Sequence, residues 1–351
     1  MYTFEKMSLA KIEALELARI YEAGGKIYGY DWLKKRAGRV HGCSDVWTGS
    51  MCKCCGKLTH MHVFGCGDKL CPVCVVRKSR ATAAQALQVV PLLKGKPILV
   101  SLTQSNVWGR LLSDELGSMS KAWQLIQMRR PVKEKLLAWA KTTEITFNPK
   151  RQDFHPHIHI IAYIPENETE MLKVSYWQNL WRSVMGLNYN PIVHVTEIYD
   201  TKGSVYEVSK YLSKSHSLLT LPNENDKLHS ILTIAIATRG RRLRSYGGEW
   251  KRVRREMLLK DVENMTDDEL TAAGNELDKN ICCDREMARV LMHWSDEGYR
   301  IVKEGPEVDE KNDWFVSLDG QRQYYIGHER DGGMREMGAV PAHNVPAVET
   351  S

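Results

Sequence analysis

The sequence predicts an α+β fold in which an antiparallel sheet is backed by helices. Segments with strand and helix patterns follow one another in the order β, α, β, β, α, β, which is the split βαβ layout. The two middle strands are separated by a turn-rich segment, so we expect them to form a hairpin. Six of the nine cysteines lie between Cys52 and Cys74, ahead of these strands, and predict a small metal-bound knuckle on the N-terminal side of the sheet.

The order of the elements follows from periodicity and from turn residues. The first 41 residues carry apolar side chains at helical spacing, and the pair Gly24-Gly25 is expected to break that helix. Trp177 and Trp181, one helical turn apart, are expected in the core. The other predicted elements are helices over 81–93, 113–128 and 170–185, and strands over 97–103, 141–147, 154–161 and 191–198.

Composition indicates a soluble globular protein. A hydrophobic share of 43% and a charged share of 26% are ordinary for such chains. The longest apolar run, residues 231–237, contains Thr233 and is far too short to cross a membrane. The N-terminus has Glu5 and Lys6 ahead of an amphipathic stretch rather than an apolar signal segment, so we expect a cytoplasmic protein with no membrane partner.

Charge is distributed unevenly along the chain. Residues 1–260 hold 40 Lys and Arg against 22 Asp and Glu, whereas residues 261–351 hold nine against 21. A basic body followed by an acidic C-terminal part indicates that the body binds a polyanion.

The strand over 154–161 carries the most distinctive chemistry, because its sequence is Phe-His-Pro-His-Ile-His-Ile-Ile. Side chains alternate between the two faces of a strand, so His155, His157 and His159 share one face. Two imidazoles separated by one residue can hold a single divalent ion. A lone histidine on a strand is usually structural, but three in register favour a metal site.

The preceding strand supplies a candidate carboxylate. If the hairpin is centred between Lys150 and Arg151, paired positions sum to 301, and Glu144 lies opposite His157 on the same face. A register shifted by one residue would turn Glu144 to the other face. The hairpin therefore predicts Glu144 as a third metal ligand if that centring holds.

The cysteine cluster predicts a structural zinc ion. Cys52 and Cys55 are followed, after fifteen residues, by Cys71 and Cys74, which is the spacing of a four-thiolate site. Cys54 or Cys66 could replace a member of the first pair, so spacing alone leaves the ligand set open. A cluster of buried thiols without metal is the alternative. Arg77, Lys78 and Arg80 follow the knuckle as candidate phosphate contacts.

Residues 203–215 form a second informative stretch. As a helix capped by Ser204, it places Glu207, Tyr211 and Lys214 on one face, at positions i, i+4 and i+7. A phenol between a carboxylate and an ammonium group is a candidate nucleophile, because a nearby cation favours the phenolate. A tyrosine on a helix is more often part of an amphipathic face, so this hypothesis depends on the histidines.

Residues 239–255 form the densest basic stretch, with Tyr246 and Trp250 among the cations. Basic and aromatic side chains together suit phosphate contacts and base stacking. The alternative is a solvated helix face. The candidate DNA-binding residues in this stretch are Arg241, Arg242 and Arg244.

Together these motifs resemble the HUH endonucleases, and among them the rolling-circle plasmid replication initiators with a single catalytic tyrosine. The resemblance covers about residues 52–250. It is carried by Cys55-Gly56, Cys66, Lys69-Leu70-Cys71-Pro72-Val73-Cys74, Ser101-Leu102-Thr103, Glu144-Ile145-Thr146-Phe147-Asn148, His155-Pro156-His157-Ile158-His159, Glu207-Val208-Ser209-Lys210-Tyr211, Gly240-Arg241-Arg242-Leu243 and Ser245-Tyr246-Gly247-Gly248.

The resemblance implies roles for particular residues. His157 and His159 would hold the catalytic ion, Mn²⁺ or Mg²⁺, and Tyr211 would be the nucleophile with Glu207 four residues before it. The family pattern favours Cys55, Cys66, Cys71 and Cys74 as zinc ligands, against the spacing argument for Cys52.

The resemblance also implies a mechanism and partners. Tyr211 would attack a phosphodiester of the plasmid origin, leaving a 5′-phosphotyrosyl link and a 3′-hydroxyl for a host polymerase, with a host helicase opening the duplex. The alternatives are a mobile-element nuclease or relaxase on the same fold, and a zinc-dependent DNA-binding protein without catalysis.

The expected organisation is an N-terminal helical segment (1–41), a zinc knuckle and helix (42–95), an HUH nicking endonuclease domain with a ferredoxin-like core (96–260), an acidic module (261–330) and a disordered tail (331–351).

Overall fold

The computed structural model describes residues 4–52, 58–199, 205, 209, 215–278, 287–295, 298–305, 314–316 and 323–325. Its contacts divide the chain into two compact units, which are described separately. The larger unit comprises Glu5–Ser44 and Gly65–Met265, and the smaller comprises Met1–Phe4, Asp45–Phe64 and Thr266–Ser351. The expected knuckle over 42–95 is therefore shared between the two units.

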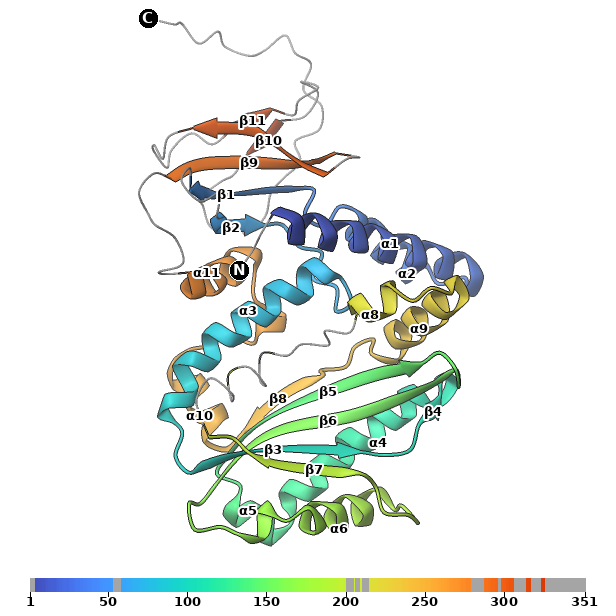
Figure 1. Cartoon of the computed structure of the whole chain (residues 1–351), viewed down its shortest axis with the longest axis vertical. Coiled ribbons are helices and arrows are strands. Elements are labelled where there is room, and N and C mark those ends of the chain that lie inside the picture. Colours follow the sequence, from blue (N-terminus) through green and yellow to red (C-terminus); the bar gives the residue numbers. More distant parts are fainter. Residues whose placement is uncertain are drawn as a thin grey trace, which may run out of the picture. The chain divides into compact units, whose positions relative to one another are not determined.

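The larger unit is built on a six-stranded sheet whose strand pairs are all antiparallel. The strands follow the order β7-β3-β6-β5-β8, and the short β4 pairs with β6 (Figure 1). The predicted β, α, β, β, α, β succession is present, with β6 in the middle of the sheet. The strands are β3 (Lys96–Thr103), β4 (Val107–Trp108), β5 (Ala138–Asn148), β6 (Asp153–Ile164), β7 (Val193–Glu197) and β8 (Arg244–Gly247).

The β5–β6 hairpin has the register that the sequence predicts. Glu144 pairs with His157, and the pairing runs without interruption from Asn148–Asp153 at the turn to Ala138–Tyr163. The turn is closed by the side chain of Asn148, which accepts hydrogen bonds from the backbone of Lys150 and Arg151 at 3.0 and 3.3 Å. This local chemistry fixes the centre of the hairpin.

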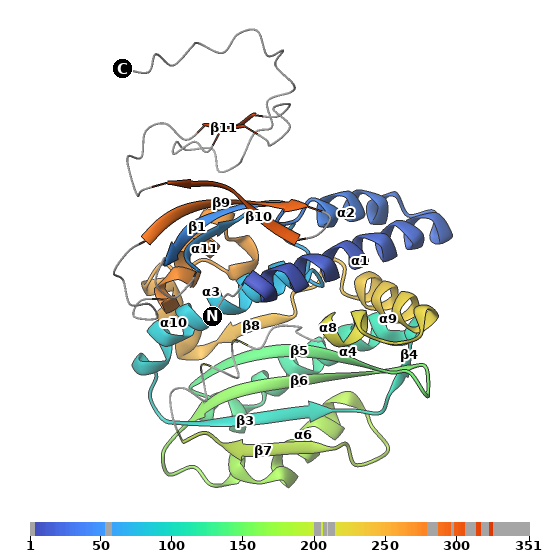
Figure 2. The same ribbon diagram turned by 45° about the horizontal axis from the view of Figure 1, so that its top comes forward.

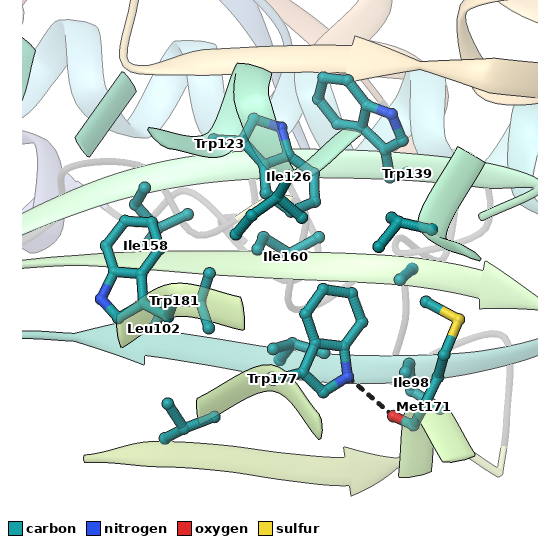
Figure 3. Close-up of a cluster of buried hydrophobic side chains, with 14 of the residues drawn as sticks. Ile98, Leu102, Trp123, Ile126, Trp139, Ile158, Ile160, Met171, Trp177 and Trp181 are labelled. Atoms are coloured by element: carbon teal, nitrogen blue, oxygen red, sulfur yellow. Dashed lines mark hydrogen bonds between the residues drawn. The ribbon is translucent and has the colours of Figure 1, made fainter. Parts of the chain in front are cut away.

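One face of the sheet is covered by α4 (Gly109–Met128), α5 (Arg130–Lys135) and α6 (Val174–Met185). Trp177 and Trp181 are fully buried there, as predicted, beside Ile158 and Ile160 of β6 (Figure 3). Each indole has a partner for its N–H: Trp177 donates to Met171 O at 2.7 Å, and Trp181 to Thr103 O at 2.8 Å. These two indoles are therefore buried with their polar groups hydrogen-bonded.

The opposite face carries the even-numbered side chains of β5 and the odd-numbered ones of β6. There α3 (Pro72–Val89) and α10 (Gly248–Glu256) pack against Ala140, Ile161 and Tyr163. Val205 belongs to the same buried cluster. The histidines of β6 are on this face, at the end of the strand nearer the turn.

The N-terminal helices α1 (Phe4–Tyr28) and α2 (Asp31–His41) pack beside α8 (Ser215–Leu219) and α9 (Glu224–Ala237), as Figures 1 and 2 show. The expectation that Gly24-Gly25 breaks the first helix is wrong. A Cβ at Gly24 would lie 2.4 Å from Leu232 of α9, so this glycine permits close helix packing. The helix ends instead before Gly29, which has a φ of +67°.

The remaining helical turns are short. They are η1 (Val90–Leu92), η2 (Glu170–Leu172), η3 (Val262–Asn264) and, in the smaller unit, η4 (Glu276–Asp278). None of the described helices combines the length and the hydropathy that a membrane crossing needs.

The smaller unit contains a four-stranded sheet in the order β10-β9-β1-β2. The segment around Cys52 thus forms strands rather than an isolated knuckle, because β1 pairs along its whole length with β9. Thr266 caps the helix α11 through a capping box with Glu269. The elements are β1 (Val46–Cys52), β2 (Leu58–Val63), α11 (Asp267–Asn275), β9 (Met287–Ser295), β10 (Gly298–Gly305), and the separate pair β11 (Trp314–Val316) and β12 (Gln323–Tyr325).

Candidate functional site

Glu144 of β5 and His157 and His159 of β6 converge on one face of the sheet. The carboxylate Oε2 of Glu144 lies 2.9 Å from His157 Nε2 and 3.0 Å from His159 Nε2. Their side chains are 18%, 11% and 31% exposed, so the site is partly shielded but open to a substrate. The hairpin register produces this cluster, since cross-strand neighbours share a face.

The other ring nitrogens indicate which atoms are available to a metal ion. His157 Nδ1 lies 3.2 Å from the carbonyl oxygen of His155, which can only accept, so Nδ1 carries the proton. In the neutral ring, Nε2 then turns a lone pair toward the Glu144 carboxylate, an arrangement that a cation between them stabilises. His159 Nδ1 is 2.9 Å from Ser101 Oγ, a similar outer contact. The three residues therefore fit a divalent ion.

His155 is on the same face but outside this group. Its ring centroid is 5.4 Å from that of His157. Burial, and then the neighbouring His157, lowers the pKa of His155. The prediction that only the second and third histidines act as ligands remains a prediction.

The predicted catalytic residues Tyr211, Glu207 and Lys214 lie outside the residues that the structure describes. Two positions of the same stretch are described, Val205 and Ser209. Val205 is 8% exposed and packs in the cluster that contains Ala140 and Ile161, on the face that also carries Glu144 and the two histidines.

Four cysteines form a second candidate metal centre: Cys43, Cys66, Cys71 and Cys74. Their Sγ atoms are 3.6 to 3.8 Å apart for the contacts Cys43–Cys74, Cys66–Cys74 and Cys43–Cys71. The backbone N–H of Cys66 donates to Cys43 Sγ, and that of Gly67 to Cys74 Sγ, each at 3.3 Å. Such a set fits a closed tetrahedral zinc site.

The thiol groups of this cluster contact one another through their sulfur atoms. Hydrogen bonds from Cys43, and then from Cys66 and Cys71, hold the pKa of Cys74 well below its usual range. A thiolate in a buried group of four is the form that binds metal.

The cluster differs in part from the predicted ligand sets. Cys66, Cys71 and Cys74 come together as expected, and Cys55 lies outside the described residues. Cys52 is buried at the end of β1 and does not belong to the group. Cys43 takes the fourth place, and its only signal in the sequence is that it precedes the other cysteines.

Cys43 is held in place by an unusual contact. The ammonium group of Lys11, whose residue is fully buried, donates to Cys43 O at 2.9 Å and to His41 O at 2.6 Å. These bonds tie the C-terminal end of α2 to α1 beside the cluster.

Two of the predicted phosphate contacts are buried. Arg77 and Lys78 of α3 are 5% and 4% exposed. Lys78 Nζ donates to Gly67 O at 3.1 Å and pairs with Glu263 at 2.7 Å. Neither side chain can reach a phosphate without losing its buried position.

The three arginines after α9 have different surroundings. Arg241 bridges α9 and α4, donating to Ala237 O at 3.0 Å and to Ser113 O at 2.9 Å. Arg244 bonds to Thr82 Oγ1 of α3. Arg242 has a side chain that is 71% exposed, so it is the most accessible of the three to DNA.

Comparison with known proteins gives consistent matches over most of the chain. The family model described as "Replication protein" matches residues 57–300. The "Protein rep" of Lentilactobacillus hilgardii is 30% identical over 258 residues, which are 67% of this chain and 81% of that protein. That of Lactiplantibacillus plantarum is 29% identical over 248 residues, 66% of this chain and 77% of that protein. No solved structure matches.

Proposed function

Because the chain belongs to the replication protein family of rolling-circle plasmid replication initiators, we propose that it starts replication by nicking one strand of its plasmid's double-strand origin. The observation that carries this proposal is the convergence of Glu144, His157 and His159 on one open face of the sheet. An ion bound by these residues would be Mn²⁺ or Mg²⁺, and would polarise the scissile phosphate and offset its developing charge.

Tyr211 is the proposed nucleophile. Its phenolic oxygen attacks the phosphorus, the bond to the 3′ oxygen breaks, and the products are a 5′-phosphotyrosyl link and a free 3′-hydroxyl. Lys214 lies three residues beyond Tyr211 and, in a helix, would favour the phenolate. Support comes from Val205, six residues earlier, which packs on the sheet face that carries the metal ligands.

The proposal also covers termination, the cysteine cluster and the host partners. Glu207, four residues before Tyr211 in the sequence, acts as general base for the water that cleaves the regenerated junction at termination. The cysteine cluster holds structural Zn²⁺. The free 3′-hydroxyl would prime a host polymerase behind a host helicase, all in the cytoplasm.

The proposal is tested with a supercoiled plasmid that carries the cognate origin, incubated with the protein with and without Mn²⁺ or Mg²⁺. We expect ion-dependent nicking at the origin, and none of a plasmid without it. Binding without nicking would indicate a zinc-dependent DNA-binding protein. Nicking at a transfer origin or an element end, and not at the replication origin, would indicate a relaxase or mobile-element nuclease.

A further inference from the structure

A groove of about 910 Å³ lies at the turn end of the β5–β6 hairpin, away from both metal centres. It is lined from four directions: by Tyr28 and Tyr30 at the junction of α1 and α2, by Trp108 at the start of α4, by Gln152 of the hairpin turn, and by Thr233 on α9. All of these residues belong to the larger unit.

The aromatic side chains of the groove are exposed rather than packed. Tyr28, Tyr30 and Trp108 are 48%, 41% and 57% exposed. The rings of Tyr28 and Tyr30 are stacked, with centroids 5.8 Å apart and planes 27° apart. The stack continues to Trp32, 6.1 Å from Tyr30 and inclined by 25°. The stacked pair Tyr28 and Tyr30 and the exposed indole of Trp108 offer flat apolar surfaces to planar ligands.

The charge at the groove is positive. Arg110 lines it and is exposed, and none of the described lining residues carries a carboxylate. Arg239, also exposed, lies over the Trp32 ring at 4.7 Å and extends the cationic edge along the end of α9. Planar rings beside guanidinium groups match a single strand of nucleic acid, whose bases stack and whose phosphates pair with cations.

The groove is built to keep this shape. Gly24 allows α1 to approach Leu232 of α9 closely, which seats the Tyr28 end of α1 beside α9. Gln152 donates to Asp226 Oδ1 at 2.8 Å, which ties the hairpin turn to the same helix. The exposed rings are therefore carried on elements that contact one another.

We propose that this groove is a stacking site for single-stranded DNA. The choice of DNA rests on the proposed function, because nicking at an origin produces an unpaired strand. Gln152, in the turn just before β6, is five residues from His157, at most about 17 Å at the rise of a strand. A strand leaving the metal centre would reach the aromatic row within a few nucleotides. Tyr28, Tyr30 and Trp32 precede the segment that matches the family, whereas Trp108 and Gln152 lie within it.

The test is fluorescence anisotropy of a labelled oligothymidylate of about 12 nucleotides, within the usual footprint of such sites. It uses the full-length protein without added Mn²⁺ or Mg²⁺, so that binding is separate from nicking. We expect Trp108→Ala and Tyr30→Ala each to weaken binding by about 5- to 140-fold, the effect of one lost stacking contact. Trp108→Phe should recover most of the loss, since a smaller ring still stacks.

Two further variants separate stacking from charge and from general effects. Arg110→Ala should reduce the slope of log affinity against log salt by about 0.7, whereas Trp108→Ala should leave the slope unchanged. Met128→Ala removes an apolar side chain that is 75% exposed at the other end of α4, and should bind as wild type does.

Several results would overturn the proposal. One is wild-type affinity in both Trp108→Ala and Tyr30→Ala. Another is tighter binding of the matching RNA than of DNA. A third is a concentration-dependent dimer that Trp108→Ala abolishes, which would assign the groove to a second copy of the chain. If the oligonucleotide binds the groove but the protein does not nick the origin, the proposed function is contradicted and the stacking site stands. If the protein nicks the origin but the groove does not bind the oligonucleotide, the stacking site is contradicted and the proposed function stands.

Discussion

Glu144 and His157 face each other across two neighbouring strands, with Oε2 of the carboxylate 2.9 Å from Nε2 of the imidazole. This pairing is fixed from both sides, because β6 also pairs with β3, where Thr103 lies opposite His157. A slip of one residue would have to break both ladders and turn every core side chain of β6 to the other face. The geometry of this candidate metal centre is thus as well specified as the core of the sheet.

Replacing either histidine of this centre should abolish ion-dependent nicking. His157→Ala and His159→Ala should each cost more than the roughly 10- to 100-fold that loss of an outer contact costs. His155→Ala should be milder, because His155 is outside the group of three. The measurement is the nicking rate as a function of Mn²⁺ concentration, and equal losses in all three variants would show that His155 is a ligand.

Ser101→Ala should weaken the centre without removing a ligand. Ser101 Oγ contacts His159 Nδ1 at 2.9 Å and orients the ring, so its loss should raise the Mn²⁺ concentration needed for half-maximal nicking by about 10- to 100-fold. Saturating Mn²⁺ should restore most of the rate, and Ser101→Thr should retain it. A lower rate that added Mn²⁺ does not recover would mean that Ser101 supports the fold and not the ring.

Zinc content should depend on Cys43 and not on Cys52. The purified chain should hold one zinc ion, Cys43→Ser should lose it together with thermal stability, and Cys52→Ser should keep it. Elemental analysis of the three proteins measures this directly. If Cys43→Ser keeps zinc and Cys52→Ser loses it, the zinc ligands are those that the cysteine spacing predicts, with Cys52 among them.

Lys141 should destabilise the fold at neutral pH. Burial lowers its pKa from 10.5 to about 8, because Lys141 is only 4% exposed. Between pH 8 and pH 10.5 the unfolded chain binds more protons than the folded one, so the free energy of unfolding rises with pH in this range. Below about pH 8 the lysine is charged in both states, and the whole cost of burying the ammonium group is present. Lys141→Met should raise the free energy of unfolding at pH 7 by about 1–3 kcal/mol.

Urea unfolding of the Lys141→Met variant and wild type at pH 7 and pH 10 measures this effect. The difference between them should shrink at pH 10, where the folded wild-type lysine is neutral. A difference that is the same at both pH values would mean that the gain comes from packing alone.

Termination should depend on Glu207 and not on Tyr206. Tyr206 is five residues before Tyr211, about 140° around a helix, so the two phenols would not share one phosphate. Glu207→Gln should nick at a near-normal rate but accumulate products longer than one plasmid unit, whereas Tyr206→Phe should behave as wild type. The opposite pattern in a replication assay would indicate a mechanism with two tyrosines.

The sequence was most informative where structure is local. The hairpin centre and the faces of the histidines follow from neighbouring residues. Long-range pairing was not predictable: β1 joins β9, more than 230 residues away, and Cys43 contacts Cys66, which lies 23 residues further along the chain. Arg77 and Lys78 follow a cysteine pair as phosphate contacts would, yet their helix turns them inward. Burial of a charge depends on a distant partner such as Glu263.

The most direct test of the account is to locate the covalent bond between protein and DNA. The wild-type protein is incubated with Mn²⁺ and a single-stranded origin oligonucleotide, digested, and analysed by mass spectrometry for a nucleotide on the peptide that spans residues 203–214. We predict a phosphotyrosyl adduct on Tyr211, its absence in Tyr211→Phe and in His157→Ala, and its retention in Tyr206→Phe. An adduct on another residue, or a normal adduct yield in Tyr211→Phe, would contradict the account.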